Sequence, residues 1–114
     1  MCGEVMAYVA RLLASLRKAG VAVRPNPCRP GILQFRAPWP PNAVPGELRP
    51  LFREIKRNKP LIYAVFYMHP LLREVREYPP PNGQPDPLDY RWNPDRQQWE
   101  YYPGWWRELL TGPG

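Results

Sequence analysis

Residues that carry out catalysis or bind metals are scarce in this sequence. Its 114 residues include one histidine, two cysteines, one serine and one threonine. A structural zinc site needs four ligands, so Cys2, Cys28 and His69 are too few to form one. The glycines form neither a P-loop nor a dinucleotide-binding fingerprint, and Ser15 lacks a nucleophile-elbow pattern around it. We therefore expect no metal, no cofactor and no enzymatic activity.

Long apolar runs are also missing. The sequence has no run of 18 apolar residues that could span a bilayer, and no charged-then-apolar leader begins it. We therefore expect a cytoplasmic protein with reduced thiols and without a membrane partner.

Proline and positive charge, by contrast, are abundant. The 18 prolines are about three times ordinary usage, and each removes a backbone donor, so we expect short helices and strands. Residues 1–78 carry 13 Lys or Arg and 5 Asp or Glu, a charge of +8, whereas residues 79–114 carry 3 and 5, a charge of −2. The basic first part suits an acidic partner, although a solvated arginine-rich surface explains the same charge.

The start of the chain predicts a helix followed by a β-hairpin. Apolar residues recur at helical spacing up to a glycine stop at Gly20. They are Val5, Val9, Leu12, Leu13 and Leu16. Residues 21–24 and 32–36 then predict two short strands on either side of a proline-rich turn. A two-stranded hairpin is marginal alone, so we expect it to pack against helices.

The second predicted strand alternates between apolar and polar side chains. This pattern places Leu33 and Phe35 on one face, which we expect to pack in the core. Gln34 and Arg36 lie on the opposite face.

Two more helices are predicted after a proline-rich connector. Leu48, Leu51, Phe52 and Ile55 give the first of them an apolar face, and the opposite face is basic. Because proline is tolerated only in the first turn, Pro50 indicates a regular start near Arg49. Lys59 and Pro60 end this helix and begin the next, which Pro70 kinks or ends.

The C-terminal third predicts a linker and then an aromatic hairpin. Residues 79–87 read as an extended proline-rich linker. Tyr90 and Trp92 share a face of one short strand, and Trp99 and Tyr101 share a face of the next. Asn93-Pro94-Asp95-Arg96 supplies the turn, and residues 103–110 predict a short helix.

This tail is expected to fold back onto the rest of the chain or onto a neighbouring copy, because exposed tryptophans favour association. Trp105 and Trp106 are adjacent, so one narrow helix stripe cannot bury both. One of them should face a partner, a second copy or the main domain, and Trp105 is the candidate we name.

The predicted fold class is therefore α+β. A small domain over residues 1–78 contains a helix, a β-hairpin and two helices. A proline-rich linker over residues 79–87 joins it to residues 88–114, which contain the short aromatic hairpin and a C-terminal helix.

Residues 7–66 resemble the N-terminal docking domain of the TubC type. In that family a helix runs into Gly-Val, a hairpin ends in a pattern like RFRAP, and two helices join at Lys-Pro. The counterparts here are Gly20-Val21, residues 34–38 (QFRAP) and Lys59-Pro60. The tryptophan-rich tail has no counterpart in this family.

The resemblance implies a non-catalytic docking or adaptor module, often dimeric, that receives an acidic segment of a partner protein by strand addition at its hairpin. A homodimer is accordingly one assembly to test. The residues that we expect to contact a partner are mostly basic. They are Arg24, Gln34, Arg36, Arg49, Arg53, Lys56, Arg57 and Trp105.

A second interpretation uses the same basic helix face. Similar segments also resemble parts of phage and mobile-element proteins, so the chain could contact nucleic acid or a complex that handles it. The acidic tail, which carries most of the tryptophans, opposes a shared groove for nucleic acid. Both interpretations are non-catalytic.

Overall fold

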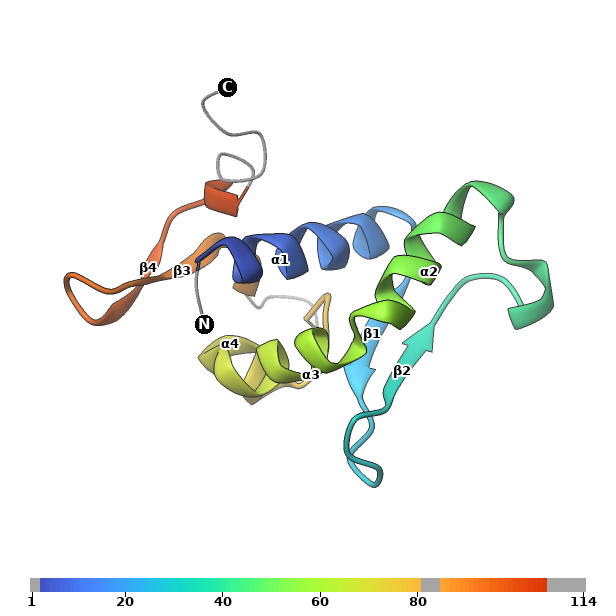
Figure 1. The fold of residues 1–114 in the computed structure, drawn as a ribbon, viewed down its shortest axis with the longest axis horizontal. Coiled ribbons are helices and arrows are strands. Elements are labelled where there is room, and N and C mark those ends of the chain that lie inside the picture. The colour runs from blue at the N-terminus through green and yellow to red at the C-terminus, as the bar shows by residue number, and fades with distance from the viewer. Residues whose placement is uncertain (1–2, 81–84, 107–114) are drawn as a thin grey trace.

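Helix α1 (Gly3–Lys18) lies between the two β-hairpins of the molecule (Figure 1). The structure, a computed structural model, describes residues 3–80 and 85–106. The predicted apolar stripe of α1 is buried except at Val5, which is half-buried, and Leu16 has no exposed surface. Gly20 follows with a φ of +82°, a left-handed conformation that glycine adopts without strain. Val21 N then donates to Leu16 O over 2.9 Å, so the predicted helix and its glycine stop are confirmed.

Strands β1 (Ala22–Pro25) and β2 (Leu33–Arg36) form the predicted antiparallel hairpin. Leu33 is buried, but Phe35 is 38% exposed. The Phe35 ring packs edge-on against Phe52, with ring centroids 5.9 Å apart. The prediction that Phe35 belongs to the core is therefore wrong, because β2 is the outer strand of the hairpin and its neighbours cover only part of the ring.

Prolines begin three consecutive helices, which are α2 (Arg49–Arg57), α3 (Lys59–Met68) and α4 (Pro70–Val75). Pro50, Pro60 and Pro70 each lie within the first turn, where a missing N–H leaves no helical hydrogen bond unmade. Two short 3₁₀ helices precede α2, at Pro41–Ala43 and Gly46–Leu48. The predicted helix starts are confirmed, and Pro70 both follows the end of α3 and opens α4.

The C-terminal segment forms the predicted aromatic hairpin. A 3₁₀ helix, Pro87–Asp89, leads into β3 (Tyr90–Asn93), which pairs antiparallel with β4 (Gln98–Tyr101). Tyr90 lies opposite Tyr101 with ring centroids 5.4 Å apart, and Trp92 lies opposite Trp99 at 6.0 Å. Cross-strand aromatic pairs of this kind stabilise short hairpins. The described residues thus form a small α+β fold, as predicted.

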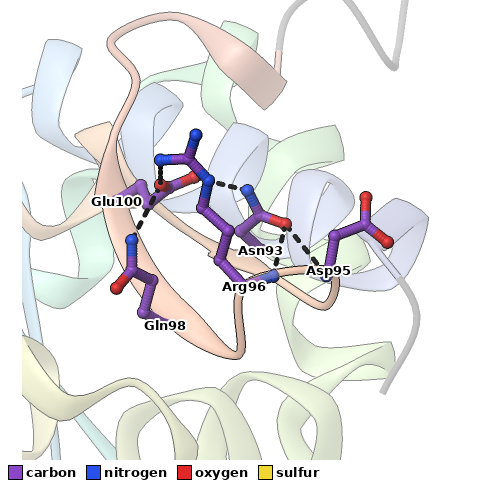
Figure 2. Close-up of polar contacts among 5 residues, drawn as sticks. All are labelled: Asn93, Asp95, Arg96, Gln98 and Glu100. Carbon is purple, nitrogen blue, oxygen red and sulfur yellow. Dashed lines mark hydrogen bonds and ion pairs between the residues drawn. The ribbon is translucent and has the colours of Figure 1, made fainter.

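Polar side chains hold the turn between β3 and β4 (Figure 2). Asn93 Oδ1 accepts from the backbone N–H groups of Asp95 and Arg96 at 3.0 and 3.3 Å. Asn93 Nδ2 donates to one Glu100 carboxylate oxygen at 2.6 Å, and Arg96 and Gln98 donate to the other at 3.3 and 3.0 Å. The hydrogen bonds from Asn93 and Gln98, together with the charge of Arg96, lower the pKa of Glu100. Glu100 therefore carries its negative charge at neutral pH.

The tail packs on the helices, which confirms that it folds back onto the rest of the chain. Leu88 joins the hydrophobic core, and Trp105 Nε1 donates to Leu88 O over 2.9 Å. His69 Nε2 lies 3.2 Å from Tyr90 O, and its ring centroid is 4.3 Å from that of Trp99. Residues 81–84 of the predicted linker, and residues 107–110 of the predicted last helix, lie outside the described residues.

Candidate partner-binding surface

One edge of the β1–β2 hairpin is covered by a distant residue. Val23 in β1 donates to Tyr78 O over 2.8 Å and accepts from Tyr78 N over 2.8 Å. Tyr78 is itself buried, and its hydroxyl donates to Asp86 at 3.2 Å. Burial, followed by the charge of Asp86, raises the pKa of Tyr78, so the hydroxyl keeps its proton. The edge of β1 that faces away from β2 is therefore occupied at Val23. The sequence did not predict this pairing, because no local pattern links Val23 with Tyr78.

The edge of β2 is open instead. In an antiparallel pair, directly opposed residues alternate between hydrogen-bonded and non-hydrogen-bonded pairs. The peptide groups of Val23 point toward Tyr78, so its partner Phe35 is in a non-hydrogen-bonded pair. The bond from Asn26 N to Ile32 O, at 2.8 Å, agrees with this alternation. The N–H and C=O groups of Leu33 and Phe35 hence point away from β1, and within the described residues they have no hydrogen-bond partner.

Three of the predicted partner-binding residues lie together on the outer face of this hairpin. Arg24, Gln34 and Arg36 line an open hollow of about 430 Å³, which Glu77 also lines. Arg24 Nε donates to Gln34 Oε1 over 2.8 Å, which fixes the guanidinium beside β2. With two arginines and one glutamate, the hollow favours an anionic group on a bound segment.

Aromatic rings lie on the other face of β2. Phe52 of α2 contacts Phe35, and Trp39 packs edge-on against Phe52 with ring centroids 6.0 Å apart. Because Phe35 is partly exposed, a segment beside β2 would meet apolar surface on this face and polar surface on the other. The sequence had predicted Phe35 as a core residue and not as part of a partner-binding surface.

Basic residues of α2 lie next to this aromatic contact along the helix surface. With 3.6 residues per turn, Lys56 and Arg49 lie roughly 40° and 60° around the helix from Phe52, on the side away from buried Ile55. Phe52 rests on Phe35 in β2, so Lys56 and Arg49 lie on the flank of α2 that is next to this aromatic contact.

Arg53 and Arg57 lie farther around α2, where they border a second hollow beside Tyr8. Glu54 does not neutralise them, because its carboxylate forms an ion pair with Arg11 at 2.7 Å and accepts a hydrogen bond from Tyr8. Burial and the nearby Glu54 raise the pKa of Tyr8, so it remains a donor. Arg53 and Arg57 are exposed and form no ion pair with the residues that the structure describes.

Trp105 does not belong to this surface. Only 6% of it is exposed, and its indole N–H is taken up by Leu88 O. The expectation that Trp105 contacts a partner is corrected, because its side chain is buried and its N–H is bonded to Leu88. Among the described tryptophans, Trp92 at 46% is the one with a large exposed area.

The described residues provide no candidate for a metal site, since no group of three or more His, Cys, Asp or Glu side chains gathers among them. Within the same residues, no helix has the length and apolar character needed to cross a membrane.

Comparisons with known proteins found no matching family model, no matching curated protein and no matching solved structure.

Proposed function

We propose that this protein is a cytoplasmic, non-catalytic docking or adaptor module that binds an acidic segment of a partner protein as an added strand on β2. The observation that carries the proposal is the open edge of β2, with Arg24 and Arg36 on one face and, on the other, Phe35 in contact with Phe52 of the basic helix α2. The resemblance of residues 7–66 to docking domains of the TubC type points the same way.

In strand addition, backbone hydrogen bonds provide the affinity and side chains provide the specificity for the partner. The peptide groups of Leu33 and Phe35 offer two donors and two acceptors, each worth about 0.5–1.5 kcal/mol net in a typical hydrogen bond. Any extended segment can use them, so side chains select the partner. Arg24 and Arg36 favour carboxylates on the outer face, and the exposed part of Phe35 favours an apolar residue on the other.

The arrangement gives less support to nucleic acid as the ligand. Exposed Trp92 lies on the β3–β4 hairpin at one end of α1, whereas α2 and its arginines lie toward the other end (Figure 1). Stacking and phosphate binding by a single strand work best when aromatic and basic residues share a groove. Nucleic acid is therefore the competing outcome in the test that follows.

The test is a pull-down from the native host, with and without nuclease, using four variants of the full chain. Phe35→Pro removes one outward N–H but leaves the β1–β2 hydrogen bonds in place, and Phe35→Ala is its control because it keeps that N–H. Arg36→Ala removes a charge from the hollow. Arg53→Glu/Arg57→Glu reverses the charge of the part of α2 that borders the hollow beside Tyr8.

A protein partner that survives nuclease, is lost with Phe35→Pro, weakens with Arg36→Ala and is retained with Phe35→Ala would support docking on β2. Circular dichroism must show that the proline variant keeps its fold. Recovery of nucleic acid alone, lost with Arg53→Glu/Arg57→Glu but unaffected by Arg36→Ala, would overturn the proposal. Salt dependence is uninformative here, because both kinds of binding weaken as ions screen the charges.

A further inference from the structure

A second open strand edge exists on β4. Tyr102 N donates to Asp89 O over 2.7 Å, so residues 89 and 102 form a hydrogen-bonded pair. By the alternation along the ladder, Tyr90 opposite Tyr101 and Trp92 opposite Trp99 are non-hydrogen-bonded pairs. The peptide groups of Trp99 and Tyr101 therefore point away from β3, and in the described part of the chain they have no hydrogen-bond partner.

The faces of β4 match those of β2. Trp99 and Tyr101 put aromatic rings on one face of β4, and Glu100 lies on the other. On β2, Phe35 lies on the apolar face and Arg36 on the polar face. When two strands pair, directly opposed residues point to the same face of the sheet. Pairing the outward peptide groups of β2 with those of β4 therefore aligns aromatic with apolar side chains and Glu100 with the basic face.

The two edges cannot meet within one molecule. The β1–β2 hairpin lies at the C-terminal end of α1, and the β3–β4 hairpin lies at its N-terminal end (Figure 1). They also belong to parts of opposite charge, because residues 1–78 carry 13 basic and 5 acidic side chains and residues 79–114 carry 3 and 5. Two molecules can bring the basic end of one against the acidic end of the other.

We propose that β4 of one copy adds as an antiparallel strand to β2 of a second copy, so that the protein assembles head to tail. In the register that uses all the outward peptide groups, Phe35 faces Trp99, Leu33 faces Tyr101, and Gln34 faces Glu100. Glu100 is then a diagonal neighbour of Arg36, within reach of its long side chain. Glu100 already contacts Arg96 at 3.3 Å, so Arg36 would join an existing ion pair.

This inference rests on the proposed function, because it names one source of the acidic segment that β2 receives. The interface is heterologous, with different surfaces on its two sides. It leaves a free β2 at one end of every assembly and a free β4 at the other, unless the row of copies closes into a ring.

A complementation experiment tests the inference. Phe35→Pro blocks the edge of β2, and Tyr101→Pro removes an outward N–H from β4. Each variant alone should be monomeric in sedimentation velocity at low salt, whereas the unmodified chain should associate further as its concentration rises. An equimolar mixture of the two variants should form one species of twice the mass of a single chain and nothing larger. Phe35→Ala and Tyr101→Ala keep their N–H groups and should still associate.

Several results would overturn the head-to-tail assembly. They are a monomeric native chain at every concentration, a mixture that stays monomeric although the native chain associates, and association that survives both proline variants. A dimer that is lost with Phe35→Pro but intact with Tyr101→Pro would show a symmetric β2–β2 contact instead.

A second set of variants covers the case in which proline disturbs the fold. Arg36→Glu and Glu100→Arg should each weaken association, and the double variant R36E/E100R should recover part of it. No recovery in the folded double variant counts against the inference. If the native chain is monomeric and yet captures a protein partner in a Phe35→Pro-sensitive way, docking on β2 stands and self-assembly falls.

Discussion

Replacing Leu16 with alanine should lower the free energy of unfolding by about 2–5 kcal/mol. Leu16 has no exposed surface and lies within the hydrophobic core, so the substitution leaves a closed cavity. The same substitution at Phe35 should cost less, although its ring is larger. Phe35 is 38% exposed, and its site opens to solvent, so only the transfer of the covered part of the ring is lost, about 1–2 kcal/mol.

Urea unfolding followed by far-UV circular dichroism and tryptophan fluorescence measures both values. Arg57→Ala is the control, because Arg57 is exposed and its replacement should change stability by no more than about 0.5 kcal/mol. A loss from Phe35→Ala as large as that from Leu16→Ala would refute the reasoning, since it would mean that Phe35 is covered on all sides. A loss below about 1 kcal/mol from Leu16→Ala would contradict its place in the core.

Three further predictions concern the contacts of the tail. Burial lowers the pKa of His69, so the unfolded chain binds a proton that the folded chain does not, and stability should fall as pH drops from about 7 to 5. His69→Gln should flatten this pH profile in urea titrations. Trp105→Phe leaves Leu88 O without its donor and should cost about 1–3 kcal/mol, read as a lower melting temperature. Ending the chain after Tyr78 should also lower the melting temperature or change the oligomer size, and an unchanged value for both would mean that the tail is an independent tether.

Local signals in the sequence account for the elements. The spacing of Leu12 and Leu16 predicts α1, and the steric limits of Pro50 and Pro60 predict where α2 and α3 begin. Such signals work because each depends on residues within about one helical turn. The turn at Asn93 is of the same kind.

Contacts between distant residues were beyond this reasoning. The pairing of Val23 with Tyr78 joins residues 55 positions apart, and it decides which edge of the hairpin is open. The buried Trp105 bonds to Leu88, 17 positions away, and no spacing pattern encodes this contact. The sequence therefore predicted the charged residues of the candidate surface, Arg24 and Arg36. It did not predict which strand edge is open.

The prolines that begin α2, α3 and α4 also affect the unfolded state. Pro50, Pro60 and Pro70 occupy positions whose backbone angles suit the pyrrolidine ring, so they cost the folded chain little. In the unfolded chain the same rings remove conformations that an ordinary residue would sample. Each compatible proline contributes about 0.4–1 kcal/mol in this way, and these three together contribute roughly 1–3 kcal/mol. Part of the stability of this small fold thus comes from restricting the disordered ensemble rather than from packing in the native one.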